Sequence, residues 1–231
     1  SGEIRRKVRE GICQYKDCAI LYRTNAQSRM FEEKFLMANI PYKLVGGVNF
    51  YARKEIKDLL AYLKTVDNAR DNLAVRRIIN VPKRGIGAAT ITRVQDYAVD
   101  QGISFYQALE QADQISTLGR AAAKLEPFVS FIRRLRSQAE FYSVQELLQQ
   151  IIDDTGYVEE LKAEDTEEAQ ARIENIDELF TKAATYEESA EEPTLSGFLE
   201  EIALVADIDS VDENDDRVLL MTLHSAKGLE F

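Results

Sequence analysis

Cys18-Ala-Ile-Leu-Tyr22, a short apolar run, predicts a buried β-strand near the start of the chain. Residues 26–38 follow with apolar side chains at helical spacing, and Asn39-Ile-Pro41 predicts the end of that helix. Tyr42-Lys-Leu-Val45 predicts a second strand, and apolar residues between 56 and 63 predict a second amphipathic helix. This strand–helix–strand–helix order is typical of a parallel α/β unit.

The pattern changes on both sides of this unit. Residues 3–10 predict a short surface helix, whereas residues 67–206 show helical periodicity and almost no strand pattern. An acidic linker at 207–216 precedes Arg217-Val-Leu-Leu-Met-Thr222, which predicts a buried strand that rejoins the sheet begun at residues 18–22. The expected fold class is therefore α/β plus all-α, a parallel α/β domain interrupted by a large helical insertion.

Local patterns mark the ends of several helices in the insertion. Ser143 and Glu146 have the spacing of a capping box, in which both side chains satisfy free N–H groups of the first turn. Gly156 predicts the end of that helix, and residues 167–188 predict a longer one. Pro127 either kinks a helix around residues 120–140 or begins its second half.

The charge of the chain is unevenly distributed. The 231 residues include 29 basic and 40 acidic side chains, a net charge of −11, which by itself disfavours a nucleic-acid partner. Residues 1–100 carry 19 basic and 11 acidic side chains, whereas residues 137–216 carry 3 basic and 25 acidic ones. One surface can therefore approach an anion, while the acidic stretch faces away from it, towards solvent or a basic protein.

Composition also indicates where the chain resides. No apolar run approaches the roughly 18 residues of a membrane span, and the first residues lack the apolar core of a signal peptide. Cys13 and Cys18 are the only cysteines, with no histidine nearby. We expect reduced thiols in a cytoplasmic protein, with a zinc site as the minor alternative and no membrane partner.

A first candidate site is Val81-Pro-Lys-Arg-Gly-Ile-Gly87, which precedes a helical pattern. The glycines let the backbone approach a partner closely, and N–H groups at a helix start favour an anion. Lys83 and Arg84 add two positive charges. The segment predicts a clamp on duplex phosphates, and the alternative is a helix–helix turn with solvated cations.

Two further candidate sites follow strands of the predicted sheet. The strand at 217–222 runs into Leu223-His-Ser-Ala-Lys-Gly228, and the strand at 18–22 runs into Arg23-Thr-Asn-Ala-Gln-Ser28. Open α/β sheets bind ligands at the carboxyl ends of their strands. The alternatives are that the single histidine, His224, is structural and that Thr24 or Asn25 only caps a helix.

Missing motifs limit the chemistry of the chain. The sequence contains no G-x-x-x-x-G-K-S/T phosphate loop and no G-x-S-x-G nucleophile elbow. Ile151-Ile-Asp-Asp154 resembles a magnesium-binding strand end, but it lies inside the helix that Ser143 begins. With one histidine and no metal-ligand spacing, a self-contained hydrolase is not expected.

Together these segments resemble the UvrD/Rep/PcrA superfamily 1 DNA helicases. Ala19-Ile-Leu-Tyr-Arg-Thr-Asn-Ala-Gln-Ser-Arg29 resembles motif IV of that family, and Gly46-Gly-Val-Asn-Phe-Tyr-Ala-Arg-Lys-Glu-Ile-Lys-Asp58 resembles the motif that follows. Asn80-Val-Pro-Lys-Arg-Gly-Ile-Gly87 resembles the duplex-binding loop, and Thr222-Leu-His-Ser-Ala-Lys-Gly-Leu-Glu-Phe231 resembles motif V. The order and spacing of the motifs match across the whole chain.

The resemblance implies a fragment of a larger motor. Residues 1–66 correspond to the first part of a RecA-like domain 2A, residues 67–213 to the helical accessory domain 2B, and residues 214–231 to the returning 2A strand. Domains 1A and 1B, with the phosphate loop and the magnesium carboxylates, are implied as partners in the same protein. ATP and Mg²⁺ belong to the intact enzyme, and the fragment alone is expected to bind neither.

The resemblance also assigns roles to residues. It implies contacts to single-stranded DNA from Arg23, Asn25, Thr222 and His224, and contacts to the nucleotide from Gly228 and Glu230. Its duplex contacts are Lys83, Arg84, Gly85, Ile86 and Gly87.

The expected function is part of an ATP-dependent 3′–5′ helicase acting in DNA repair or replication. The alternative is a non-enzymatic module that binds duplex DNA or a protein and regulates the motor. A recombination-type helicase–nuclease of the same superfamily is a third, minor alternative.

Overall fold

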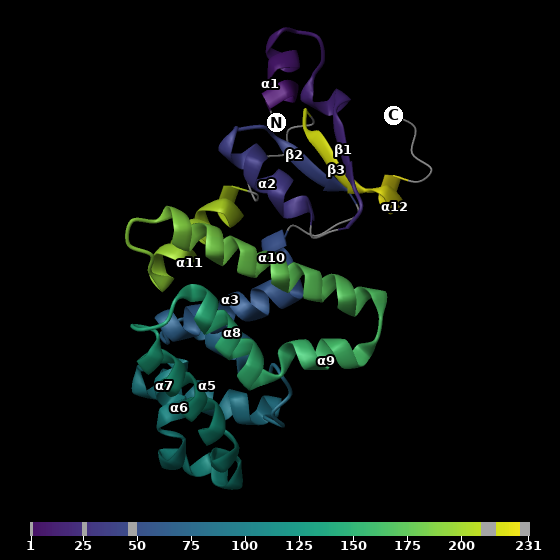
Figure 1. Cartoon of the computed structure of the whole chain (residues 1–231). Coiled ribbons are helices and arrows are strands. Elements are labelled where there is room, and N and C mark those ends of the chain that lie inside the picture. The colour runs from purple at the N-terminus through teal and green to yellow at the C-terminus, as the bar shows by residue number, and fades with distance from the viewer. Residues whose placement is uncertain (1, 25–26, 46–49, 209–215, 227–231) are drawn as a thin grey trace. The chain divides into compact units, whose positions relative to one another are not determined.

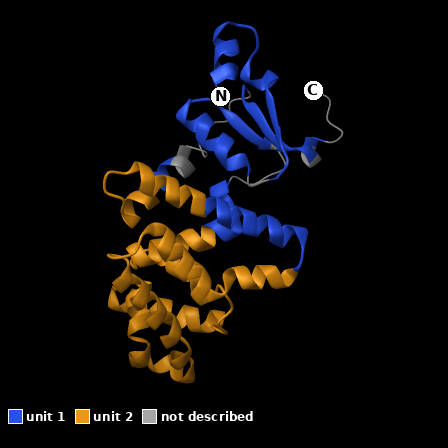
Figure 2. Ribbon diagram, viewed as in Figure 1, with its two compact units in different colours: residues 1–56, 165–179, 200–231 blue, residues 57–164, 180–199 orange. Residues whose placement is uncertain are grey.

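The computed structural model describes residues 2–24, 27–45, 50–208 and 216–226. The chain forms two compact units (Figure 2). Unit 1 contains residues 1–56, 165–179 and 200–231, and unit 2 contains residues 57–164 and 180–199. Three helices contribute residues to both units: α3 (Lys54–Asp67), α10 (Glu167–Ser189) and α11 (Leu195–Ile208).

Unit 1 is built around a parallel sheet of three strands (Figure 1). The strands β1 (Ala19–Tyr22), β3 (Val218–Thr222) and β2 (Tyr42–Val45) lie in that order, with Tyr22 opposite Thr222 and Val45 opposite Met221. The predicted return of the last strand to the sheet of the first is therefore confirmed. The other elements of the unit are α1 (Gly2–Arg9), η1 (Tyr15–Asp17), α2 (Ser28–Met37), η3 (Phe50–Ala52) and α12 (Leu223–Ala226).

Helix α2 covers one face of this sheet. Phe35 of α2 and Ile40 pack against Tyr22, Val218 and Leu220 in one buried cluster. Asn39 adopts a left-handed conformation, φ 49°, which ends the helix where the sequence predicts. The short turn after it returns the chain directly to β2.

The prediction that residues 18–22 form a buried strand is correct for the strand and wrong for the burial. Strand β1 lies at an edge of the described sheet. Because side chains alternate between faces, Ile20 and Tyr22 pack on the cluster beneath α2, while Ala19 and Leu21 point to the other face and are exposed. An apolar run indicates that a segment is hydrophobic, but it does not indicate whether helices cover one face of the strand or both.

Unit 2 is helical, as predicted for this part of the chain. Residues 67–206 contain helices and no strand. The elements that lie wholly in the unit are α4 (Asn72–Ile78), α5 (Ala88–Gln101), α6 (Phe105–Glu110), η4 (Ala112–Gln114), η5 (Ser116–Lys124), α7 (Glu126–Gln138), α8 (Val144–Thr155) and α9 (Tyr157–Glu164). None of the helices that the structure describes combines the length and the apolar character needed to span a bilayer.

The predicted helix ends in unit 2 are confirmed. The Ser143 hydroxyl accepts a hydrogen bond from the Glu146 N–H at 3.2 Å, and the Glu146 carboxylate accepts one from the Ser143 N–H at 2.8 Å. Gly156 ends α8 in the left-handed conformation, φ 63°. Pro127 lies in the first turn of α7, so it begins that helix and does not kink a longer one.

A buried carboxylate joins three helices of unit 2. Asp58 of α3 is 2% exposed. It accepts hydrogen bonds from Nε of Arg77 in α4 at 2.8 Å and from the hydroxyl of Tyr157 in α9 at 2.9 Å. A buried carboxylate needs such partners, because an unpaired charge in the interior is costly. This contact fixes α3 and α4 at the base of the loop that follows α4.

Candidate nucleic-acid interface

The carboxyl edge of the sheet gathers two of the predicted contact segments. Because all three strands are parallel, the residues after β1 and those after β3 emerge at the same edge. Arg23 follows β1 with an exposed side chain, and Thr222 is the last residue of β3. This is the edge at which open parallel sheets bind their ligands.

Gln27 closes the turn after β1. Its side-chain oxygen accepts the N–H groups of Arg23 at 2.9 Å and of Thr24 at 3.2 Å, and its own N–H donates to the Thr24 carbonyl at 3.1 Å. Thr24 makes no side-chain cap of α2, so that alternative is wrong for Thr24. The sequence analysis did not single out Gln27, which it placed inside the helix predicted over residues 26–38, whereas α2 begins at Ser28.

The other predicted contacts at this edge fall where the structure is not described. Asn25, Gly228 and Glu230 lie outside the described residues, as does the Gly46–Asn49 part of the motif that follows motif IV. His224 belongs to α12 by its backbone, and its side chain is also outside the described part. Their roles stay predictions.

The loop between α4 and α5 is held by its own polar groups. The Asn80 side-chain oxygen accepts the N–H groups of Arg84 at 2.8 Å and of Ile86 at 3.4 Å. The last carbonyls of a helix have no partners within the helix. At the end of α4 the Arg84 guanidinium is the missing partner: it donates to the carbonyls of Ile78 at 2.9 Å and Ile79 at 3.3 Å.

Arg84 has further partners inside unit 2. It donates to the Tyr62 hydroxyl at 2.6 Å and to the Val81 carbonyl at 3.1 Å, and its guanidinium carbon lies 5.3 Å from the centre of the Phe128 ring. Tyr62 in turn donates to the Val81 carbonyl. Burial raises the pKa of Tyr62, and the nearby Arg84 only partly opposes this, so the phenol stays protonated as a donor.

Two of the predicted duplex contacts also have a structural role. Arg84 is not a solvated cation, because its guanidinium is occupied by carbonyls that the end of α4 leaves open. Ile86 is only 3% exposed, since it packs into the core of unit 2. Both side chains hold the shape of the loop, and their contacts with duplex DNA stay predictions.

The other three predicted duplex contacts, Lys83, Gly85 and Gly87, are exposed. Lys83 is the exposed cation of the loop, and Gly85 has φ 68°, a conformation that side-chain-bearing residues rarely adopt. Gly87 is the N-cap of α5, and a Cβ added there would meet no atom within 4 Å. The N-terminus of α5 therefore stands open to an approaching anion, with Lys83 in the same loop.

Comparison of the sequence with known proteins shows its family. Residues 1–231 match the UvrD-like helicase C-terminal domain. The chain is 46% identical to the ATP-dependent DNA helicase PcrA of Bacillus subtilis (strain 168) over 100% of its own length, and 46% identical to the PcrA of Staphylococcus aureus (strain Mu50 / ATCC 700699) over 99% of it. The chain belongs to the UvrD-like helicase family.

The resemblance drawn from the motifs is thereby confirmed, including its PcrA-type character. The PcrA of Staphylococcus epidermidis (strain ATCC 35984 / DSM 28319 / BCRC 17069 / CCUG 31568 / BM 3577 / RP62A) is 45% identical over 99% of this chain. The chain spans about a third of the length of these relatives, 32% of the Bacillus subtilis protein and 31% of the two staphylococcal ones.

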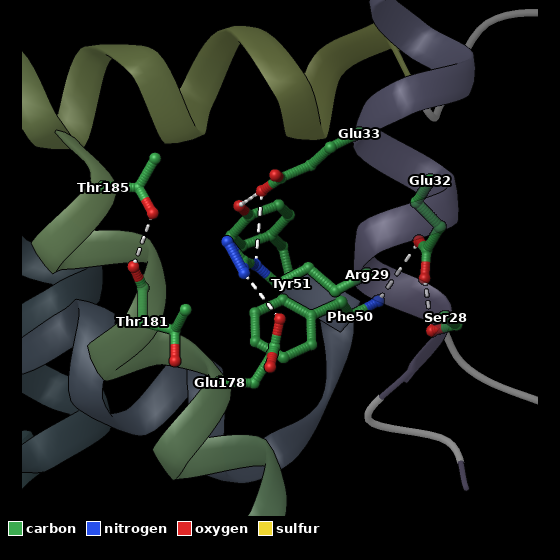
Figure 3. A network of polar contacts seen from close by, with 9 residues as sticks. All are labelled: Ser28, Arg29, Glu32, Glu33, Phe50, Tyr51, Glu178, Thr181 and Thr185. Atoms are coloured by element: carbon green, nitrogen blue, oxygen red, sulfur yellow. Dashed lines mark hydrogen bonds and ion pairs between the residues drawn. The ribbon is translucent and has the colours of Figure 1, made fainter. Parts of the chain in front are cut away.

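Behind the carboxyl edge, this UvrD-like chain carries a buried polar network (Figure 3). The Ser28 hydroxyl, in the first turn of α2, donates to Glu32 at 2.5 Å and accepts from Nη2 of Arg53 at 2.8 Å. The second Glu32 oxygen lies 3.5 Å from the N–H of Phe50 and accepts from it. Ser28 and Glu32 are 0% and 3% exposed, so the start of α2 is anchored from within the unit.

Arg29 is the second centre of this network. Its Nη1 donates to Glu178 of α10 at 2.7 Å, and its Nε lies 3.3 Å from a Glu33 oxygen as an ion pair. The Tyr51 hydroxyl donates to the same Glu33 oxygen at 3.0 Å. Burial, followed by the charge of Glu33, raises the pKa of Tyr51, so the phenol remains a donor (Figure 3).

Arg53 extends the network to α3 and α10. Its Nη1 donates to the Asn175 side-chain oxygen at 2.6 Å, and the Asn175 amide donates to Glu55 at 2.5 Å. Burial lowers the pKa of Arg53, while Glu32 and Glu55 oppose the shift. The guanidinium carbons of Arg29 and Arg53 lie 5.9 and 5.3 Å from the Phe50 ring centre, within cation–π range.

The sequence analysis did not predict this network. Ser28 and Glu32, like Arg29 and Glu33, stand four residues apart, which indicates helical neighbours. Glu178 lies 149 residues from Arg29, and Asn175 lies 122 residues from Arg53, so no local spacing could pair them. The network supports the contact edge and does not itself form an exposed site.

Proposed function

We propose that this chain is the DNA-holding part of an ATP-dependent DNA helicase that translocates 3′ to 5′ on a single strand. Membership of the UvrD-like helicase family carries the proposal. In the proposed protein, residues 1–66 and 214–231 belong to the motor domain 2A, and residues 67–213 form the accessory domain 2B. DNA repair or replication in the cytoplasm is the proposed setting.

Single-stranded DNA is the proposed ligand of the carboxyl edge of the sheet. Arg23, Asn25, Thr222 and His224 are the proposed contacts. The parallel pairing that brings the ends of β1 and β3 to one edge supports this, as does the exposed Arg23 side chain. Gly228 and Glu230 are the proposed nucleotide contacts, so the segment after β3 would couple the nucleotide to the tracking strand.

Duplex DNA is the proposed ligand of the loop between α4 and α5. Lys83 supplies the charge, and the backbone at Gly85 and Gly87 allows a phosphate to approach the start of α5. Arg84 and Ile86 act in this proposal by shaping the loop, since their side chains are turned into unit 2.

Replacing Lys83 with alanine is expected to weaken duplex binding severalfold at low salt, equally for all sequences. The slope of log affinity against log salt should fall by about 1, because one phosphate contact is lost. The measurement is fluorescence anisotropy of a labelled blunt duplex titrated with the chain over a range of salt concentrations.

Lys162→Ala is the matched control, since it also removes an exposed lysine but lies among acidic residues on α9. It should leave the affinity unchanged or lower it only slightly, because the lost charge lies away from the proposed site. Equal losses for both variants would show a nonspecific charge effect, and no loss for Lys83→Ala would refute the duplex site.

ATP and Mg²⁺ are the proposed substrate and metal of the intact enzyme. Among the residues that the structure describes, no group of three or more His, Cys, Asp or Glu side chains is placed to hold a metal ion. The proposal gives this chain no catalytic step, because its sequence contains no phosphate loop. The chain contributes the proposed nucleotide contacts and depends on domains 1A and 1B for the phosphate loop.

Purified residues 1–231 are expected to show no DNA-stimulated ATPase activity, because the sequence has no phosphate-binding loop. Phosphate release with and without single-stranded DNA is the measurement. Turnover above background that disappears in Glu230→Ala would contradict this expectation.

A regulatory module without its own catalysis is the second proposal. The 25 acidic and 3 basic side chains of residues 137–216 favour a basic protein as its partner. The duplex titration separates the two proposals. If Lys83→Ala leaves duplex binding unchanged and a basic protein displaces the duplex, the regulatory module is favoured.

A further inference from the structure

The two cysteines of the chain meet in unit 1. Sγ of Cys13 and Sγ of Cys18 lie 3.8 Å apart, and both side chains are half-buried free thiols. Cys13 follows the end of α1, and Cys18 immediately precedes β1. Neither thiol has a part in the proposed DNA contacts.

The surroundings disfavour a metal site. Two thiolates make up only half of a tetrahedral zinc site, and within the described ranges no third His, Cys, Asp or Glu completes a ligand group. A thiol pair at this distance has another reaction available, because a disulfide requires the sulfurs to close by only about 1.8 Å, to their bonded separation.

The two sulfurs can approach one another by movement of Cys13, while backbone hydrogen bonds hold Cys18 in place. Cys18 is held in the sheet, since its carbonyl accepts from the Leu219 N–H at 3.0 Å and its N–H donates to the Tyr15 carbonyl at 3.0 Å. Besides the contact with Cys13, its thiol makes a long 3.7 Å contact to the Gln14 carbonyl, which is given up at little cost. Cys13 lies in the turn between α1 and η1, so its side chain can move towards Cys18.

We propose that Cys13 and Cys18 form a reversible dithiol–disulfide site that is oxidised by hydroperoxides. One thiol attacks hydrogen peroxide and becomes a sulfenic acid, with release of water. The second thiol then attacks the sulfenic sulfur, which forms the S–S bond and releases a second water. The two thiols lose two electrons in total, and the peroxide gains both.

The disulfide would join the turn after α1 to the start of β1, the strand that leads to Arg23. Burial, together with the neighbouring Cys13, raises the pKa of the Cys18 thiol. Its thiolate fraction at neutral pH is therefore small, and oxidation should be slower than for an unperturbed dithiol. This inference does not depend on the helicase proposal.

Treatment of the reduced chain with hydrogen peroxide tests the site. We expect both thiols to disappear together in a thiol titration of the unfolded chain, with a mass decrease of about 2 Da. The product should remain monomeric on a non-reducing gel, and dithiothreitol should restore both thiols. Cys13→Ser and Cys18→Ser are the matched variants, and each should fail to give the internal product and instead form linked dimers or overoxidised thiol.

Three results would overturn the proposal. The first is a wild-type chain that keeps both thiols at every peroxide dose that leaves the fold intact, including doses that oxidise the single-cysteine variants. The wild-type chain could instead gain about 32 Da per cysteine, the mark of sulfinic acid, or link two chains as its main product. Each of these shows that the two thiols do not react with one another.

Discussion

Arg84→Ala is expected to lower the free energy of unfolding of unit 2 by about 2 to 4 kcal/mol, the largest loss for any residue of the α4–α5 loop. The guanidinium satisfies the Ile78 and Val81 carbonyls and the Tyr62 hydroxyl, and hydrogen bonds from a charged donor contribute about 1.5 to 3 kcal/mol. The variant also loses the packing of the guanidinium on the Phe128 ring.

Urea unfolding followed by far-UV circular dichroism measures the effect, since the chain has no tryptophan for fluorescence. Lys83→Ala is the matched control, because it removes the neighbouring, exposed cation and should change stability by less than about 0.5 kcal/mol. Arg84→Lys should recover little, because an ammonium group cannot reproduce the planar fork of donors. An Arg84→Ala chain of wild-type stability that no longer binds duplex DNA would instead make Arg84 a direct contact.

Arg29→Met is expected to lower the free energy of unfolding of unit 1 by about 3 kcal/mol. Removing one partner of a buried ion pair leaves a carboxylate without compensation, at a cost of about 3 to 5 kcal/mol. We place the effect at the lower end because the Glu178 side chain is 28% exposed and can recruit water. Glu33 keeps the hydrogen bond from Tyr51.

The double variant Arg29→Met, Glu178→Gln should be less destabilised than the sum of the two single variants, because the second change removes the charge that the first left unpaired. Arg133→Ala is the matched control: Arg133 pairs with Glu110 at 3.4 Å, but its side chain is 60% exposed, and such surface pairs contribute about 0 to 1 kcal/mol. If Arg29→Met costs no more than Arg133→Ala, the network of Figure 3 is not a stabilising element.

Much of the fold could be predicted because its information is local. The apolar runs at 18–22 and 217–222 predicted two strands of one parallel sheet, and the structure places them in that sheet as direct neighbours. The capping box at Ser143 and the left-handed end at Gly156 each involve a few adjacent residues, and both predictions were confirmed. The extent of burial of β1 could not be predicted, because it depends on which layers cover the sheet.

The same distinction between local pattern and tertiary packing applies to the candidate site. The sequence by itself determined that a loop with two cations and two glycines precedes a helix, and that polar residues follow two parallel strands. Only the tertiary structure decided that Lys83 is exposed while Arg84 turns inward, and that Arg29 is buried against Glu178. A cationic side chain is buried only where hydrogen-bond acceptors replace the water that it loses. For Arg84 these acceptors are carbonyls at the end of a helix, and for Arg29 the acceptor is a carboxylate 149 residues away.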